Sequence, residues 1–329
     1  MFQPGFFDLD NRMHKIDSNN DPLTKINQAV DLEIFRPALE KPCKAAAGPK
    51  GYDVILLFKN PVLQSLYNLS DDATEYQILN RHSFCRFLGL HTGSKIPDAT
   101  TIWLFRKGLK NAGIIEELFS QFELHLQECG YTVMKEQIAD ASIVKTQIQR
   151  NSREENEQIK CEGKAPVQWG KNKRQRKDVD ARWTRKNGKS YFGYKNHISI
   201  DVKHKFIRDW KVTDASVHDS NVFEEILAEN TNRTVWADSA YYSKDRLKSL
   251  EKSGYRECIH RKGTRSRKLT VREHKSNRTR SKVRVRIEHV FGVQTQKAGN
   301  LLIRTVGLTR IVMRNLAYNM DRLGTLPAT

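Results

Sequence analysis

The pattern of apolar and polar positions changes near residue 130. From Val54 to Cys129 apolar residues recur at helical spacing, as Leu63, Leu66 and Tyr67 show. Residues 1–50 carry no clear pattern of either kind. The first 130 residues are therefore predicted to form a bundle of short helices.

Local signals support this prediction by marking where helices begin. Ser70 followed by Asp71 and Asp72 is typical of a helix cap with an acidic first turn. The same kind of pattern predicts further helices over Ser83–Leu90, from Pro97-Asp98 onward, and over Ile114–Cys129.

Beyond residue 130 short apolar runs alternate with amphipathic stretches. Strands are predicted within Thr132–Val144, over Tyr191–Asp201 and Lys205–Thr213 as a hairpin, and over Thr234–Asp238 and Arg256–His260. Helices are predicted over Ser220–Glu229, Lys244–Lys252, a segment centred on Ile287–Gln294, and Val312–Leu323. This order indicates a mixed α/β domain with one central sheet over residues 131–329, after a helical domain over 1–130.

Residues 145–190 interrupt this alternation. They are polar and strongly basic and include the run KNKRQRK at 171–177. We expect a long loop or insertion that is partly disordered without a partner. A solvated loop or an import-like basic patch is the alternative interpretation of the run.

Charge separates the two parts of the chain more sharply than periodicity does. Residues 1–130 carry 14 Lys and Arg against 16 Asp and Glu, whereas residues 131–329 carry 43 against 22. The stretch 261–286 alone has 12 basic residues and the single acid Glu273. Such a one-sided field favours a polyanionic partner, of which nucleic acid is the commonest. A solvated basic surface or a ribosome-associated protein remains the alternative.

The spacing of the cysteines and the lack of long apolar segments indicate the cellular compartment of the protein. The five cysteines are widely spaced and form no C-x-x-C pair, which argues against a disulfide framework or a zinc site. The N-terminus MFQPGFFDLD lacks the pattern of a signal peptide, and no apolar run is long enough to span a membrane. We expect a cytoplasmic protein with no membrane partner.

Three carboxylates stand out by their settings. Asp140 in IADAS and Asp238 in VWADSAYY end predicted strands, and Glu288 in VRVRIEHVFG lies on a predicted helix. Taken singly, each aspartate is an ordinary cap or turn residue, and Glu288 an ion-pair partner for Arg284 or Arg286.

As a set, the three carboxylates favour metal chemistry. Active groups collect beyond the carboxyl ends of strands in open sheets, and clustered carboxylates need a compensating cation. Oxygen ligands suit Mg²⁺ or Mn²⁺, and in a basic, DNA-seeking protein the natural reaction is two-metal phosphoryl transfer.

An ordered set of motifs resembles a known family. The segments are YNLSDDATEYQI at 67–78, IPDATTIWLFRKGL at 96–109, IADASIV at 138–144, YFGYKNHISID at 191–201, the pair His218-Asp219, VWADSAYYS at 235–243, and RVRIEHVFG at 284–292. From about Asn60 to the C-terminus the chain resembles bacterial insertion-sequence transposases of the DDE type, in the insertion-sequence-five family. The resemblance implies a ribonuclease H-like catalytic domain with Asp140, Asp238 and Glu288 as its metal-binding triad. It also implies two Mg²⁺ ions per site, for which Mn²⁺ can substitute.

The chain departs from the family pattern around the glutamate. The family often has Tyr seven residues before it, Arg four before and Lys seven after. Arg284 fits, but Ser281 and Thr295 replace the other two, and Lys297 lies two residues beyond the expected lysine. These departures concern contacts with DNA ends more than the triad, and leave open whether this copy is active.

Candidate DNA contacts fall into three groups. Near the triad, the guanidinium forks of Arg284 and Arg286 suit phosphates, and Lys195 and His197 face the active centre or donate to phosphates. In the helical domain, Thr100 and Thr101 reach base edges as in a helix-turn-helix, with Arg106 on a phosphate, unless the bundle serves dimerisation instead. The basic insertion contributes Lys171, Lys173, Arg174, Arg176 and Lys177. Four aromatic residues near charged segments are candidates for stacking on an unpaired base, with core packing as the default for Trp236: Trp183, Trp236, Tyr241 and Tyr242.

The sequence thus predicts a transposase that binds double-stranded inverted-repeat ends as a homodimer or larger assembly and joins them to target DNA. Bacterial cytoplasm, in association with the nucleoid, is the expected location. Two rivals remain. One is a structure-specific nuclease without strand transfer, and the other is a non-catalytic DNA-binding repressor derived from a transposase.

Overall fold

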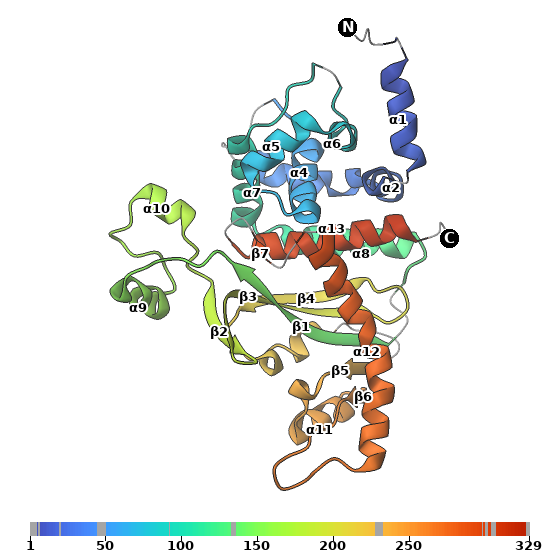
Figure 1. Cartoon of the computed structure of the whole chain (residues 1–329), viewed down its shortest axis with the longest axis vertical. Coiled ribbons are helices and arrows are strands. Elements are labelled where there is room, and N and C mark those ends of the chain that lie inside the picture. The colour runs from blue at the N-terminus through green and yellow to red at the C-terminus, as the bar shows by residue number, and fades with distance from the viewer. Residues whose placement is uncertain are drawn as a thin grey trace. The chain divides into compact units, whose positions relative to one another are not determined.

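The chain divides into two compact units. The computed structural model describes residues 5, 7–19, 21–44, 51–91, 93–132, 136–227, 233–297, 299, 302–303 and 307–326. One unit comprises residues 1–130 with 313–329, and the other residues 131–312 (Figure 1).

The first unit is helical, as predicted. Its elements are α1 (Asp8–Ser18), α2 (Pro22–Ala29), η1 (Leu32–Phe35), α3 (Arg36–Lys44), α4 (Val54–Tyr67), α5 (Asp71–Asn80), α6 (His82–Leu88), α7 (Ala99–Ala112), α8 (Ile115–Glu128) and most of α13 (Thr309–Thr325). The described part of the first 50 residues, where the sequence shows no clear pattern, is therefore largely helical as well.

Side-chain caps begin the helices where the sequence predicted them. The Ser70 hydroxyl accepts a hydrogen bond from the Ala73 N–H at the start of α5 (3.2 Å). The Asp98 carboxylate does the same for the Thr101 N–H at the start of α7 (2.6 Å). Each bond satisfies a backbone donor that the first turn of a helix leaves free.

Most of the last helix, from Met313 onward, packs in the helical unit, while Ile311 in its first turn packs with Val144 and Tyr194 of the sheet. Gly324 of α13 lies so close to α2 that a Cβ there would be 3.0 Å from the Lys25 backbone. Leu316 and Met320 of α13 are fully buried. The predicted domain over 131–329 included this helix, whereas residues 313–329 belong with residues 1–130. Periodicity shows that a helix has an apolar face but not which surface covers it.

The second unit contains one mixed sheet in the order β2-β3-β1-β5-β6, with β4 paired to β3 and β7 to β1. The strands are β1 (Gln137–Thr146), β2 (Arg182–Lys186), β3 (Lys189–Asp201), β4 (Ile207–Asp214), β5 (Thr234–Ala237), β6 (Arg256–Ile259) and β7 (Leu302–Ile303). β1, β3 and β4 are antiparallel, whereas β5 and β6 continue the sheet parallel to β1. This is the ribonuclease H-like arrangement, and it confirms the predicted fold class.

In the described part of this unit, the long helices after β5 are α11 (Lys244–Lys252) and α12 (Val271–Lys297). α11 has the predicted bounds. α12 is much longer than the predicted segment around Ile287, because the basic stretch before it is already helical from Val271.

The insertion at 145–190 is more ordered than predicted. It contains α9 (Arg153–Glu162), α10 (Lys171–Arg176) and β2. Ser152 and Glu155 form a reciprocal capping box at the start of α9. The buried Trp169 indole then donates to the Glu155 carboxylate (2.7 Å). These local polar bonds order a segment whose low hydrophobicity suggested a loop.

The predicted helix over 220–229 is wrong for its described part. Residues 228 and 229 lie outside the described residues, and the rest forms two short 3-10 turns, η2 (Asp219–Asn221) and η3 (Glu224–Ile226). The His218 ring accepts a hydrogen bond from the Ser220 N–H (3.2 Å) and so caps the first turn.

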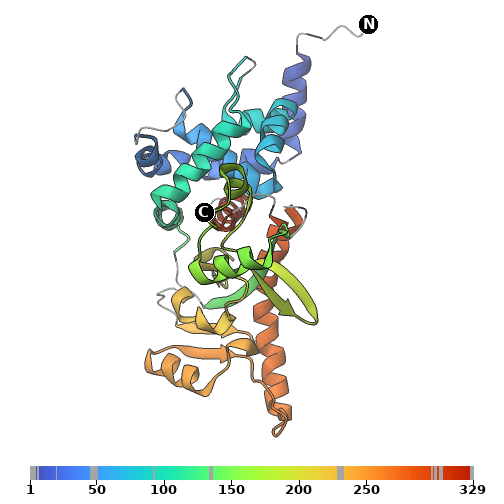
Figure 2. The ribbon, with the colours of Figure 1, turned by 90° about the vertical axis from the view of Figure 1, so that its left-hand side faces the viewer.

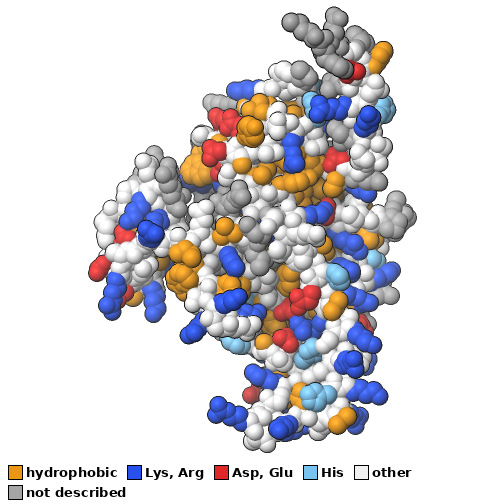
Figure 3. Space-filling model, viewed as in Figure 1, with side chains coloured by type: hydrophobic (Ala, Val, Ile, Leu, Met, Phe, Trp, Pro, Cys, Tyr) orange, Lys and Arg blue, Asp and Glu red, His pale blue; other side chains and the backbone are white. Residues whose placement is uncertain are grey.

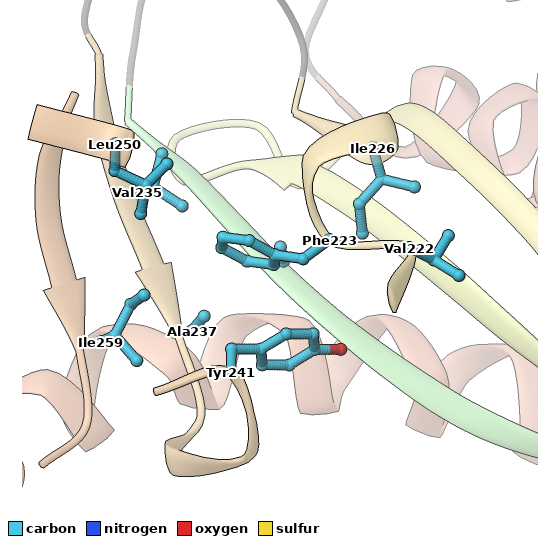
Figure 4. Packing of buried hydrophobic residues seen from close by; sticks show 9 residues of the cluster. Val222, Phe223, Ile226, Val235, Ala237, Tyr241, Leu250 and Ile259 are labelled. Carbon is cyan, nitrogen blue, oxygen red and sulfur yellow. The ribbon is translucent and has the colours of Figure 1, made fainter. Parts of the chain in front are cut away.

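The apolar side chains of these turns anchor in the core beside the sheet. Figure 4 shows Phe223 and Ile226 packed with Val235 and Ala237 of β5 and with Tyr241. The Phe223 and Tyr241 ring centroids are 4.8 Å apart. This cluster fixes the segment that follows β5, where Asp238 lies. Within the described ranges no helix is long and apolar enough to cross a membrane.

Candidate active site

Strand register places the two candidate aspartates side by side. The parallel pairing of β1 with β5 aligns Ile138 with Trp236. Two residues further along each strand direction are Asp140 and Asp238, on the same face because side chains alternate with a period of two. Asp140 lies within β1, and Asp238 follows the last residue of β5.

A single guanidinium connects the two aspartates. Arg284 of α12, the helix that packs against β1 and β5, donates from Nη2 to the Asp140 carboxylate at 2.6 Å. Its Nη1 lies 3.4 Å from Asp238 Oδ1. The side chains of Asp140 and Arg284 are only 16% and 13% exposed, so this ion pair is largely removed from water.

Glu288 lies one helical turn beyond Arg284 on α12. Its side chain is exposed, and its negative charge contributes to raising the pKa of Asp140. Among the described residues, no three Asp, Glu, His or Cys side chains converge closely enough to hold a metal ion. Arg284 thus links Asp140 and Asp238. The charge of Glu288 is near enough to affect the pKa of Asp140, but Glu288 is not in contact with the two aspartates.

The two aspartates have opposite electrostatic settings. Burial raises the pKa of Asp140, with help from Glu288 and against the effects of Arg284 and the Ala141 N–H. The pKa of Asp238 is lowered, first by its hydrogen bond with His260 and then by the Ser239 N–H and Arg284. Asp140 is therefore a carboxylate that a nearby cation would stabilise, and Asp238 is firmly ionised.

Two further residues complete the site, and the sequence reasoning gave neither of them a catalytic place. His260 follows β6, and its Nδ1 lies 3.5 Å from Asp238 Oδ1. The parallel pairing of Ala237 with Ile259 places Asp238 beside His260, so the strand-end rule used for the aspartates could have found it. Tyr241 is buried, and its hydroxyl has no hydrogen-bond partner among the described residues. Burial and the nearby Asp140 raise the pKa of Tyr241.

Lys195 and His197 of β3 belong to the interior of the sheet unit. Lys195 Nζ lies 2.9 Å from the Asp219 carboxylate and donates to the Val217 carbonyl. His197 is fully buried and bonded to the Thr213 hydroxyl (3.0 Å), and burial lowers its pKa to about 4. A fully buried ring does not reach a phosphate, so we leave His197 out of the DNA interface.

Arg106, a candidate phosphate contact, is also internal. Its guanidinium binds both oxygens of Asp71 and the Gln64 side chain, and the residue is 8% exposed. The prediction for Arg106 is wrong, because a buried, fully engaged guanidinium is not available to DNA. Thr100 at the start of α7 is exposed and Thr101 half-buried, so both remain candidates.

Several basic side chains of the insertion bind other residues of the same insertion. Lys173 pairs with Glu155 at 2.5 Å, and Lys177 donates to the Asn151 side chain at 2.9 Å. Arg174 donates to the Val167 carbonyl (2.8 Å). The side chains of Lys171 and Arg176 lie outside the described residues.

Comparison with known proteins agrees with this architecture. The sequence predicted that Asp140 ends a strand, but β1 continues to Thr146, so only Asp238 lies at a strand end. A ribonuclease H-like sheet with acidic residues on two adjacent parallel strands is typical of nucleic-acid phosphoryl transferases. The family model described as "Transposase DDE domain" matches residues 133–320, and "Transposase domain (DUF772)" matches residues 10–108. The chain belongs to the DDE transposases.

A solved structure is also similar in part. It is described as "Cryo-EM structure of piggyBac transposase synaptic complex with hairpin DNA", and is 11% identical with a TM-score of 0.41. The alignment covers 92% of this chain and 73% of that chain.

Membership of the family confirms the predicted enzyme class. The protein is a DNA-binding transposase that cuts and joins DNA and depends on a divalent metal ion. The finer assignment to the insertion-sequence-five family stays a prediction.

Proposed function

We propose that Asp140, Asp238 and Glu288 are the catalytic, metal-binding carboxylates of this transposase. Water is the nucleophile that opens a phosphodiester at each inverted-repeat end, and the freed 3′-hydroxyl then attacks target DNA. The observation that supports this most is the position of Arg284, whose guanidinium is shared by Asp140 and Asp238. Two aspartates from different strands already surround one cationic group there.

The residues fit Mg²⁺ chemically. The donors are carboxylate oxygens, which hard divalent cations prefer, and burial makes a neighbouring cation favourable for Asp140. We propose two ions per site, Mg²⁺ in the cell with Mn²⁺ as a substitute. When bound, such ions activate the attacking oxygen and stabilise the charge on the leaving oxygen.

The chain's own groups orient the carboxylates. The Ala141 N–H donates to Asp140 (2.8 Å), and the Ser239 N–H donates to Asp238 (2.6 Å). His260 Nδ1 lies 3.5 Å from the same oxygen, Asp238 Oδ1. Arg284 shares its one positive charge between both aspartates in the free protein. Its release would leave a guanidinium next to the scissile phosphate.

α12 supplies phosphate contacts beside this site. Figure 3 shows Lys and Arg side chains gathered along this helix. Five of its exposed basic residues have no ion-pair partner among the described residues: Arg272, Lys275, Arg278, Lys282 and Arg286. Such cations bind duplex DNA without regard to sequence and hold it across the carboxylates.

The reaction needs both transposon ends at once, so we propose a homodimer or larger homo-oligomer on double-stranded DNA, in the bacterial cytoplasm at the nucleoid. Thr100 and Thr101 at the exposed start of α7 are the proposed readers of the end sequence. Dimerisation through the helical unit is the alternative use of that surface.

Cleavage and joining of DNA that carries the inverted repeats flanking the gene tests this proposal. The wild type with Mg²⁺ is compared with Asp140→Ala, Asp238→Ala and Glu288→Ala, and with Glu251→Ala as a control on the exposed face of α11. We expect joined products from the wild type and the control. Each triad variant should lose about 10³-fold or more of its cleavage rate while still binding.

Other outcomes identify the rivals. Cleavage without joined products by the wild type indicates a structure-specific nuclease. Binding without cleavage indicates a repressor. A triad variant that keeps its activity removes that carboxylate from the proposed site.

A further inference from the structure

A two-stranded ribbon extends beyond the central sheet. β2 pairs with the first residues of β3, from Arg182 with Gly193 to Lys186 with Lys189. β1 meets β3 only from Gly193 onward, and β4 from Tyr194 onward. Residues 189–192 therefore pair with β2 alone, and Figure 2 shows this yellow-green hairpin projecting from the sheet.

The ribbon leaves the sheet at a fixed point. At Gly193, with φ of 152°, a Cβ would lie 2.1 Å from the Val144 carbonyl oxygen. Only glycine permits this approach of β3 to β1. At the other end, Asn187 (φ 51°) and Gly188 (φ 77°) form the tight turn with two positive φ values that suits a two-residue hairpin.

An aromatic pair stiffens the ribbon and stays open to solvent. Trp183 lies opposite Phe192, with ring centroids 5.3 Å apart. Cross-strand aromatic contacts of this kind stabilise hairpins that would otherwise be marginal in water. Trp183 is nonetheless 53% exposed, an unusual position for so large an apolar side chain.

The tip of the ribbon is basic and uncompensated. Arg185, Lys186 and Lys189 are exposed, and none of their side chains has an ion-pair or hydrogen-bond partner among the described residues. The sequence from 181 to 200 contains no Asp or Glu. Lysines on a free edge also deter pairing with other strands, but that role does not explain an exposed Trp183 on the same face as Arg185.

We propose that this ribbon, residues 182–192, is an arm that enters a groove of the DNA duplex. A two-stranded β-ribbon fits the major groove, the three tip cations suit the flanking phosphates, and Trp183 offers an apolar surface to bases or sugars. The inference rests on the proposed function only in taking duplex DNA as the partner. It does not depend on the carboxylate triad.

Register also gives the arm a position on the DNA. Asp140 lies opposite Ile198 of β3. The turn of the ribbon joins Lys186 of β2 to Lys189, the first residue of β3. Ten residues of strand span roughly 33 Å. A duplex running along β3 therefore meets the tip about nine or ten base pairs from the scissile phosphate, at 3.4 Å per base pair.

The salt dependence of binding tests the arm directly. The affinity of the full chain for an inverted-repeat duplex is measured by fluorescence anisotropy over a range of salt concentrations. The triple variant Arg185→Ala, Lys186→Ala, Lys189→Ala is compared with Lys244→Ala, Lys248→Ala, Lys252→Ala, which removes equal charge from exposed positions on α11. α11 packs by β6, at the opposite edge of the sheet.

We expect the slope of log K against log salt to become shallower by about 2.7 in the arm variant, since each lost phosphate contact changes it by about 0.9. The α11 variant should keep the wild-type slope. Trp183→Ala should weaken binding about tenfold at unchanged slope, because it removes an uncharged contact. Hydroxyl-radical protection about nine or ten base pairs from the cut should disappear in the arm variant.

Three results would overturn the inference. They are an unchanged slope in the arm variant, an equal loss of slope in both triple variants, or a change of oligomeric state without a change of slope, which would make the ribbon edge a contact between copies. Failure of the wild type to bind the duplex at all would instead reject the proposed function.

Discussion

Arg106 of the helical unit and Arg284 of the sheet unit are both largely removed from water, and they pair with aspartates in different ways. Arg106 of the helical unit binds both oxygens of Asp71, while Gln64 accepts from Arg106 and donates to Asp71. One positive charge meets one negative charge, and the neighbouring amide satisfies donors and acceptors on both. This network is complete within the unit.

Arg284 of the sheet unit is outnumbered. The one charge of Arg284 is shared between Asp140 and Asp238, and Glu288 adds a further negative charge one turn later on the helix. The Nε of Arg284 has no hydrogen-bond partner among the described residues. A balanced buried pair stabilises a fold only if it stays intact, whereas an excess of carboxylate invites a further cation. Arg106 therefore stabilises the fold, whereas Arg284 occupies a site where a further cation can bind.

The largest effect on stability is expected from breaking the balanced pair. Asp71→Ala leaves the Arg106 guanidinium buried without its counter-charge, which should lower the free energy of unfolding by about 3–5 kcal/mol. Urea unfolding followed by circular dichroism measures it. The double variant Asp71→Leu, Arg106→Met should regain most of the loss. A loss under about 1 kcal/mol for Asp71→Ala would show that the network is not structural.

The second prediction concerns pH and the interior of the sheet unit. Because burial lowers the pKa of His197 from 6.5 to about 4, the unfolded chain takes up this proton more readily than the folded one. Stability from this group is complete above pH 6.5 and is lost as pH falls toward 4, by roughly 3 kcal/mol in total.

Urea midpoints of the wild type and His197→Gln between pH 7 and pH 4 isolate this contribution. The variant should lose less stability on acidification, and the control His82→Gln, at an exposed position on α6, should follow the wild type. Parallel pH profiles for wild type and His197→Gln would mean that the buried ring does not titrate as inferred.

The smallest expected effect concerns Arg284 and the binding of Mg²⁺. Arg284→Gln removes the internal cation from Asp140 and Asp238, so the affinity for Mg²⁺ without DNA should rise about tenfold, or about 1.4 kcal/mol. Isothermal titration calorimetry measures it, with Arg286→Gln as the exposed control on the same helix. Unchanged or weaker Mg²⁺ binding in Arg284→Gln would remove the proposed competition between guanidinium and metal.

Much of the architecture was predictable because its signals are local. The Ser70 cap, the hairpin of β3 and β4, and the bounds of α11 each depend on residues a few positions apart. The insertion was predicted less well, since α9 depends on a capping box and on a bond from Trp169 to Glu155, 14 residues away. Low hydrophobicity alone favoured a loop there.

The sequence by itself determined the class of enzyme and the order of the strands along the chain, because motif and period are both written within short segments. It also associated each of the two aspartates with a strand, whereas the pairing of β1 with β5 that brings them together is tertiary. Only the tertiary structure decided that Arg106 and His197 are interior, that the last helix joins the helical unit, and that Arg284 reaches Asp140 across 144 residues. Periodicity shows which face of an element is apolar, but the partner of a buried charge depends on which surfaces the folded chain brings together.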